Sequence, residues 1–387
     1  MIEATKNQKM LFVVVAVVTA VYSIFAAVLM TEPGQSLNLP RSWVVAYYHY
    51  RWLFIGLNVA LLIYLWYLHL SLKIWTRFWM SLATVGVVVC IIAANFLLTA
   101  FFPSYQYGAN YVSIEEADGI LDDNEVIYAV EINGEVRGFP RKHLEVPHIA
   151  GDNIGGKDVV MTFCALSNLP VVIEQDIGFG KSDLGILIQT HNNLVMVDRQ
   201  SGELIQQITR QTEFSDSEIV SHPNTMTTWR SFKELYPDAK IFIYEFNRVV
   251  DSLLLALFEG PMEKQFSNEH GPIFPTLAMT DNRLLPKEQV WGFDAGNVQV
   301  AFTRSFAKQN PLFRFSLEGQ SLVMVYDEEH DIVNLFDGSI DGQLVDFESV
   351  DFRGVTENGQ LVQLPMHNGV FWMVWSHWYP DTQVYDG

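Results

Sequence analysis

Apolar residues in this chain of 387 residues gather in its first quarter, where they form three long runs. The runs cover residues 10–30, 52–70 and 78–102, and none of them contains Lys, Arg, Asp or Glu. A helix of about 20 apolar residues is long enough to cross a hydrocarbon core of about 30 Å. The pattern therefore predicts that residues 1–104 form a transmembrane region of three helices, with the lipid bilayer as a partner.

The first run is longer than the apolar core of a secretory signal peptide, and no clear cleavage site follows it, so we expect a retained anchor. The polar residues within the runs are Asn58, His69 and Asn95. A conduction pathway normally contains several ionisable groups that face inward. The pattern instead favours hydrogen bonds between helices and an interfacial His69, and it disfavours a transporter or pump.

Basic residues in the short loops indicate the orientation, because Lys and Arg are retained on the cytoplasmic side during insertion. Two basic residues lie in the tail before residue 10 and two lie in the loop 71–77, which fall on the same side. The loop 31–51 also carries two arginines and weakens the contrast. We expect a multi-pass cell-membrane protein with a cytoplasmic N-terminus and, after Pro103, an extracytoplasmic domain, which is periplasmic in a Gram-negative cell.

Beyond Tyr105 the apolar positions occur in short β-rich runs separated by Gly, Asn and Asp. Two of these runs, residues 126–132 and 135–139, flank the dipeptide Asn133-Gly134, which is a strong hairpin signal. Further strands are predicted at residues 159–163, 169–174, 194–197, 322–326 and 332–336.

The soluble part also repeats itself, with three pairs of similar segments in the same order. The pairs are residues 125–140 with 289–303, residues 156–163 with 319–326, and Trp229 with Trp372, each of which precedes Tyr-Pro-Asp by seven residues. We therefore predict an α+β chain in which the transmembrane region is followed by a mainly β, internally duplicated soluble domain. Its expected parts are a first half at 105–248, a connector helix and loop at 249–280, and a second half at 281–387.

Charge separates the two regions and excludes some partners. Residues 1–104 contain six basic and two acidic residues, so the remainder carries a net charge of −24 against −20 for the whole chain. A domain this acidic repels nucleic acid and anionic head groups. With only two cysteines, Cys90 and Cys164, a disulfide framework is excluded as well.

Cys164 is the first candidate for chemistry, because it ends an apolar strand. Its thiol would act as a nucleophile or a soft-metal ligand, with His148, His191 or His222 as base, and Cys164 with His148 as the metal pair. The alternative is a buried small side chain, which is the usual place of a free cysteine. The histidines lack metal-ligand spacing, so His143 and His148 are predicted to be surface or loop residues.

Asp198 and Arg199 follow a predicted strand and precede Ser201-Gly202, a pattern typical of a turn. The functional alternative is an Asp-Arg pair that lines a pocket and orients a substrate carboxylate. The candidate catalytic residues are thus Cys164, His148, His191, Asp198 and Arg199, and the sequence identifies no cofactor.

Several motifs of the soluble part occur together in one known family. They include Gly138-Phe139-Pro140, Met161-Thr162-Phe163-Cys164, Asp198-Arg199, Asp281 to Glu288, and Tyr379-Pro380-Asp381. In this order they resemble the bacterial proteins of the domain-of-unknown-function 3179 family, over most of residues 123–387. The resemblance implies a fold and a place in the bacterial envelope, but no established activity.

The chain departs from the family pattern at three places. Relatives carry a second cysteine three residues after the position of Cys164, where this chain has Ser167, and a tryptophan at the position of Ile205. The loop 215–225 is shortened. Since the most reactive position is lost, we expect a membrane-anchored binding or accessory module that contacts an envelope protein or a small ligand. The alternative is an envelope redox or metal-dependent enzyme centred on Cys164 and nearby histidines.

The loop charges generate a test of orientation. A reporter enzyme that is active only outside the cytoplasm should be active when it is fused after Gly387, and it should be silent when it is inserted within residues 71–77. The opposite pattern of activity would show that the orientation is reversed.

Overall fold

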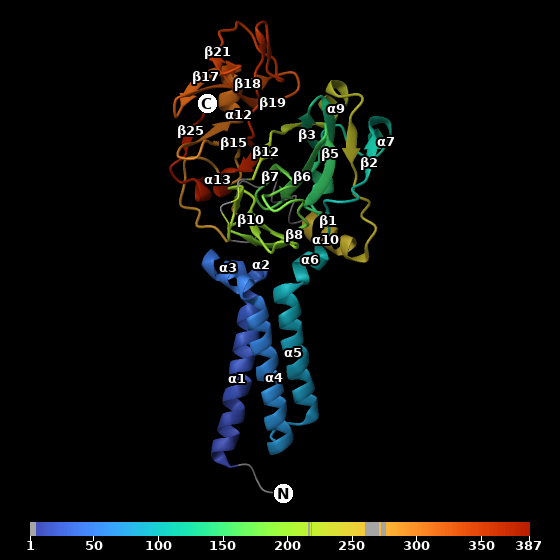
Figure 1. The fold of residues 1–387 in the computed structure, drawn as a ribbon, viewed down its shortest axis with the longest axis vertical. Coiled ribbons are helices and arrows are strands. Elements are labelled where there is room, and N and C mark those ends of the chain that lie inside the picture. Colours follow the sequence, from blue (N-terminus) through green and yellow to red (C-terminus); the bar gives the residue numbers. More distant parts are fainter. Residues whose placement is uncertain (1–4, 216, 218, 260–270, 272–275) are drawn as a thin grey trace. The chain divides into compact units, whose positions relative to one another are not determined.

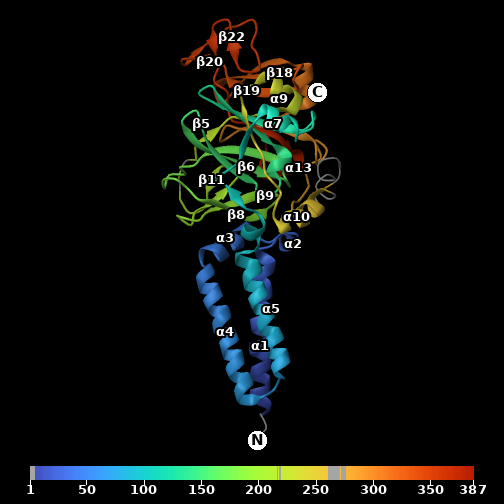
Figure 2. The same ribbon diagram turned by 90° about the vertical axis from the view of Figure 1, so that its right-hand side faces the viewer.

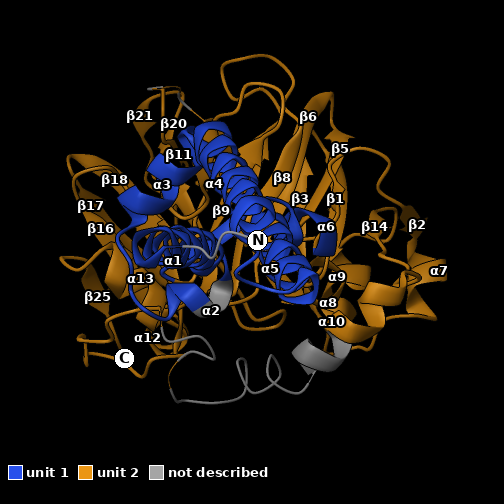
Figure 3. Cartoon of the chain, turned by 90° about the horizontal axis from the view of Figure 1, so that it is seen from below, with its two compact units in different colours: residues 1–101, 188–191 blue, residues 102–187, 192–387 orange. Residues whose placement is uncertain are grey.

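The computed structural model describes residues 5–215, 217, 219–259, 271 and 276–387. Its contacts divide the chain into two compact units (Figure 3). One unit comprises residues 1–101 and 188–191, and the other comprises residues 102–187 and 192–387. The first is mainly helical and the second is mainly β-sheet.

Three helices of the first unit are long and apolar enough to cross a membrane, and they lie side by side (Figures 1 and 2). They are α1 (Lys6–Leu29), α4 (Arg51–Leu72) and α5 (Arg77–Asn95). At most 28 % of each apolar window is buried, which leaves most of these side chains available for contact with lipid. The three apolar helices therefore lie where the hydrophobic pattern predicts them.

The third apolar helix ends at Asn95, before the predicted end at residue 102, and the loop 31–51 contains short helices. Asn95 ends α5, where its side chain donates to the carbonyl of Ile91 at 2.9 Å and to the hydroxyl of Tyr47 at 3.1 Å. Such side-chain bonds to the backbone compete with the regular helix. The short helices of this unit are α2 (Glu32–Gln35), α3 (Arg41–His49) and α6 (Leu97–Phe101).

Polar side chains within the bundle bond one helix to another. The Ser23 hydroxyl donates to the side chain of Asn58 at 2.8 Å, and the Trp66 indole donates to Thr84 at 2.9 Å. These bonds confirm the interpretation of the polar residues as contacts between helices. His69 is buried near the end of α4, where its ring lies edge-on to Trp66.

The second unit contains five sheets of three to five strands in a propeller-like arrangement, and two small hairpins. The first strands are β1 (Ser104–Tyr105), β2 (Tyr111–Ser113), β3 (Val126–Ile132), β4 (Glu135–Pro140), β5 (Ile149–Ile154), β6 (Lys157–Cys164), β7 (Leu169–Glu174), β8 (Leu184–Thr190) and β9 (Asn193–Asp198). The next are β10 (Leu204–Gln206), β11 (Gln211–Thr212), β12 (Ser221–His222), β13 (Thr225–Thr228), β14 (Lys240–Phe242), β15 (Gln289–Asp294), β16 (Gln299–Thr303) and β17 (Leu312–Leu317). The last are β18 (Gln320–Asp327), β19 (Ile332–Asp337), β20 (Ser339–Ile340), β21 (Gln343–Leu344), β22 (Val355–Thr356), β23 (Gly359–Gln360), β24 (His367–Phe371) and β25 (Gln383–Tyr385).

Helices join several of these strands. They are α7 (Ile114–Asp118), α8 (Arg141–Leu144), α9 (Trp229–Leu235), α10 (Val249–Glu259), α12 (Arg304–Gln309) and α13 (Trp372–Trp378). The predicted connector helix and loop at 249–280 begins with α10. Residues 260–270 and 272–275 of this connector lie outside the described residues.

The predicted strands are present, and the Asn-Gly hairpin has the expected geometry. Asn133 and Gly134 have φ values of 51° and 79°, the positive pair that a type I′ turn requires. The turn joins β3 to β4 in register from Ile132 with Glu135 to Ile127 with Pro140. Local sequence therefore determines this hairpin directly.

Two sheets of this unit have the same order and the same directions of pairing. In one sheet, neighbouring strands follow the order β13, β3, β4 and β14. The first two neighbouring pairs are antiparallel and the third pair is parallel. In the other, β24, β15, β16 and β25 repeat that order and those directions. In each sheet a tryptophan begins the helix between the first strand and the last, at Trp229 in α9 and at Trp372 in α13.

Glycine allows these two helices to pack closely against their sheets. A Cβ atom on Gly292 would lie 2.4 Å from the ring of Trp375, and one on Gly138 would lie 2.8 Å from the ring of Phe232. Real side chains do not tolerate such distances. The absent Cβ thus lets the large rings of α13 and α9 reach the sheets.

Candidate functional site

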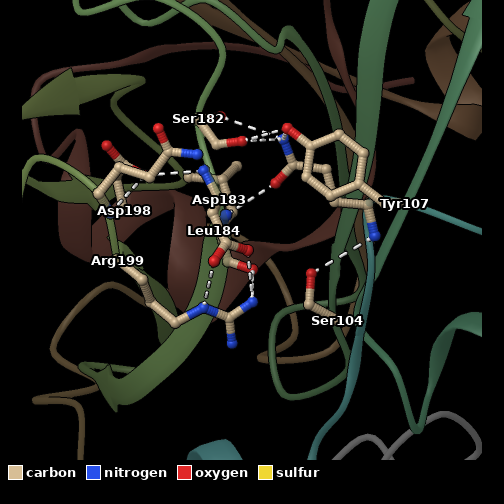
Figure 4. A network of polar contacts seen from close by, with 9 residues as sticks. Ser104, Tyr107, Ser182, Asp183, Leu184, Asp198 and Arg199 are labelled. Atoms are coloured by element: carbon tan, nitrogen blue, oxygen red, sulfur yellow. Dashed lines mark hydrogen bonds and ion pairs between the residues drawn. The ribbon is translucent and has the colours of Figure 1, made fainter.

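Asp198 and Arg199 organise a turn. Asp198 accepts hydrogen bonds from the backbone amides of Asp183 at 2.8 Å and of Ser201 at 3.0 Å (Figure 4). Burial alone would raise the pKa of Asp198, but the hydrogen bonds from Ser201 and from backbone amides outweigh it and lower the pKa. Arg199 binds both carboxylate oxygens of Asp183, at 2.5 and 3.0 Å. The hydrogen bonds of Asp198 and Arg199 therefore stabilise the turn and its contact with Asp183.

Cys164 ends β6 opposite Leu169 of β7 and is fully buried. Its sulfur donates to the backbone carbonyl of Asn192 at 3.6 Å. A nucleophilic thiol is normally partly accessible to its reagent. This position thus matches the structural interpretation of Cys164 better than the reactive one.

His148 lies beside the same strand, since its carbonyl accepts from the amide of Phe163 at 2.7 Å. Only 1 % of the residue is exposed, and burial lowers the pKa of His148 to about 4, so the ring is neutral at pH 7. Its Nδ1 lies 3.2 Å from the carbonyl of Leu144. A carbonyl only accepts, so Nδ1 carries the proton.

The remaining candidate histidines are His143, His191 and His222. His191 lies in the turn between β8 and β9, next to Asn192, whose carbonyl accepts from the sulfur of Cys164. The prediction that His143 and His148 are surface or loop residues is wrong for His143, which is buried in α8 with its Nδ1 beside the backbone of Tyr244. His148 lies in the loop between α8 and β5, but it is buried rather than on the surface. His222 binds the carboxylate of Glu174 at 3.2 Å.

His367 is a further buried histidine of the β unit whose pKa is strongly lowered. Burial, assisted by the charge of Arg210, lowers its pKa to about 3. Its Nε2 lies 2.7 Å from the carbonyl of Ile208. This carbonyl also accepts from the hydroxyl of Tyr379 at 3.1 Å, so His367 is a neutral member of the core.

A groove of about 510 Å³ is the best candidate for a ligand site in the described part of the β unit. One wall comes from residues 129–236 and consists of Ala129, Glu131, Asn133, Gly134, Pro223, Thr225 and Tyr236. The other wall comes from residues 352–363 and consists of Phe352, Arg353 and residues 360–363. The size is that of a small-molecule site, and a few polar groups converge on it.

Hydrogen bonds hold the floor of this groove. The side-chain amide of Asn334 donates to the Thr225 hydroxyl at 3.0 Å and to the carbonyl of Phe352 at 2.8 Å. Gln363 also donates to Thr225, at 3.2 Å. These bonds connect the two walls and fix the polar atoms of the floor.

Arg353 and Tyr236 form one edge of the groove. The guanidinium lies 4.9 Å from the centre of the Tyr236 ring and donates to the carbonyl of Leu235 at 3.0 Å. Burial, with the negative charge of Glu131, raises the pKa of Tyr236 to about 12. Its hydroxyl therefore remains protonated at neutral pH.

Sequence reasoning missed this groove. Its residues are spread from Ala129 to Gln363, and no single segment carries a recognisable motif.

Comparisons with known proteins give one match. A family model described as "Protein of unknown function (DUF3179)" matches residues 102–382. No curated protein and no solved structure matches the chain.

The environment of Cys164 predicts an inert thiol. Cys164→Ser should lower the free energy of unfolding by about 1–3 kcal/mol, because the hydroxyl replaces a packed sulfur in a buried position. In a Cys90→Ser background, Cys164 should react with iodoacetamide far more slowly in the folded chain than after denaturation. Rapid alkylation of the folded chain at neutral pH would contradict the structural role.

Proposed function

This chain belongs to the DUF3179 family, whose description states no activity, and we propose that it is a membrane-anchored binding module. Its ligand is a small polar molecule that carries hydroxyl or amide groups and lies in the groove beside α9. The observation that carries the proposal is the groove of about 510 Å³ with polar groups from two walls.

The chemistry of the lining supports this class of ligand. Glu131 supplies a carboxylate acceptor, while Gln360 and Gln363 supply amides that both donate and accept. Tyr236 and Phe352 supply apolar surface for the body of the ligand. This mixture suits a saccharide or a short peptide better than a hydrophobic molecule.

The polar side chains at the floor of the groove are held in place by hydrogen bonds, which favours ligand binding. Thr225 and Gln363 line the groove and are already held by hydrogen bonds from Asn334 to Thr225 and from Gln363 to Thr225, so they lose little conformational freedom when a ligand arrives. Preorganised polar groups increase affinity because less ordering accompanies binding.

An extracytoplasmic position of the β unit belongs to the same proposal. The basic tail before residue 10 and the basic loop 71–77 favour a cytoplasmic N-terminus, and three spans then carry the domain across the membrane. A binding module in that position meets polar ligands or proteins of the cell envelope.

We also propose that the β unit arose by internal duplication. The repeated sequence segments are supported by the two sheets with matching strand order and by the helices that begin at Trp229 and Trp372. Under this proposal the groove is formed between a first half at 105–248 and a second half at 281–387.

The enzyme hypothesis centred on Cys164 has less support. The thiol is fully buried. Asp198 accepts from the backbone amide of Asp183, and Arg199 binds the carboxylate of the same residue. No group of the groove wall is a cysteine or a histidine.

A bulky residue at the groove wall tests the binding proposal. The probes are a panel of mono- and disaccharides and of di- and tripeptides, measured with the full chain in detergent by saturation-transfer NMR. At least one probe should bind, and Val362→Trp should weaken it by about tenfold or more, equivalent to about 1.4 kcal/mol, because the indole fills the groove.

Val355→Trp is the matched control. Val355, in β22, and Val362, after β23, are both exposed and seven residues apart, but only Val362 lines the groove. The control should bind like the unmodified chain. Equal binding by both variants, or no binding by any probe, would contradict a ligand site in the groove.

A further inference from the structure

We propose that the β18–β19 turn and the end of α9 bind one divalent transition-metal ion through Glu234, Glu329 and His330. One ligand atom from each of these residues lies within 4.8 Å of the other two. Glu234 comes from the last turn of α9, and the other two come from the turn after β18. None of the three residues lines the ligand groove, although the ring of His330 lies 6.0 Å from that of Phe352 in the groove wall.

The state of His330 distinguishes this group from an ordinary acidic surface. His330 is 9 % exposed, and its Nε2 is buried without a hydrogen-bond partner among the described residues. A buried polar atom without a partner is costly and calls for an explanation. A metal ion held with the two neighbouring carboxylates supplies the missing partner.

Asp327 prepares the ring for this role. Its carboxylate lies 3.2 Å from Nδ1 of His330 and also accepts from the His330 backbone amide at 2.9 Å. Because an ionised carboxylate only accepts, the neutral tautomer that this contact selects has its proton on Nδ1 and its lone pair on Nε2. A carboxylate that orients a histidine in this way is the usual support of a metal-bound imidazole.

The fold holds the ligands together although they are distant in sequence. The hydroxyl of Thr227, at the end of β13, donates to the carbonyl of His330 at 3.2 Å. The next residue, Thr228, caps α9, whose last turn carries Glu234. The turn and the helix are therefore anchored to one strand.

Nearby charges leave the two glutamates available. Arg304 forms its ion pair with Asp331, and the hydroxyl of Tyr326 donates to Asp331 as well, so both groups bind Asp331 rather than Glu329. No ion pair of Glu234 or Glu329 occurs among the described residues within 4 Å. Two carboxylates with one imidazole favour Zn²⁺ or a similar ion over Ca²⁺ and Mg²⁺, which prefer oxygen ligands alone.

The experiment uses the full chain in detergent after treatment with a chelator, and ZnCl₂ alone as the probe in isothermal titration calorimetry. One Zn²⁺ should bind per chain. His330→Asn should remove this binding, and Glu329→Gln should weaken it by about tenfold or more. Asp327→Asn, which changes only the support of the ring, should weaken it by about 10–100-fold.

Glu328→Gln is the matched control, because it removes the same charge from the same turn without removing a proposed ligand. It should bind Zn²⁺ within about twofold of the unmodified chain. Melting curves by circular dichroism verify that the variants are folded. If His330→Asn unfolds, Glu329→Gln still tests the proposal, because the exposed Glu329 can be replaced without disturbing the core. Unchanged Zn²⁺ affinity in folded Glu329→Gln, or equal losses in Glu328→Gln and Glu329→Gln, would overturn the proposal.

Discussion

Three buried asparagine side chains hold residues 105–248 against residues 281–387, and the groove depends on this junction. Asn168 donates to the carbonyl of Gly369 at 2.7 Å, and Asn368 donates to the carbonyl of Asn224 at 2.5 Å. Asn334 reaches the hydroxyl of Thr225. A buried amide that loses its partner costs about 1–3 kcal/mol, so separation of the two segments is opposed at each of these bonds.

Both proposed sites lie across the same junction. The groove takes Glu131 and Thr225 from the first segment and Gln363 from the second. The metal ligands divide in the same way, with Glu234 in the first segment and His330 in the second. Since either segment alone supplies only part of each site, binding requires the assembled β unit. The helical unit supplies three helices that are long and apolar enough to cross a membrane.

Sequence patterns predicted the elements that depend on local chemistry. The Asn133-Gly134 turn followed from its dipeptide, and the apolar runs gave the three long helices. Features that depend on contacts between residues distant in sequence were harder to predict from sequence patterns. The burial of His148 rests on packing beside Phe163, and the end of the third helix rests on a bond from Asn95 to another helix. The groove and the metal ligands combine residues from separate segments, so no local pattern reveals them.

The central claim is that the two segments form one cooperative unit. Native-state hydrogen exchange of the full chain in detergent tests it directly, through the amides of β3 (Val126–Ile132) and β15 (Gln289–Asp294). If the junction holds the segments together, the most protected amides of both strands should exchange with the same opening free energy and the same dependence on denaturant. Complete exchange of one strand while the other remains protected would show that the segments unfold independently, and it would contradict the account.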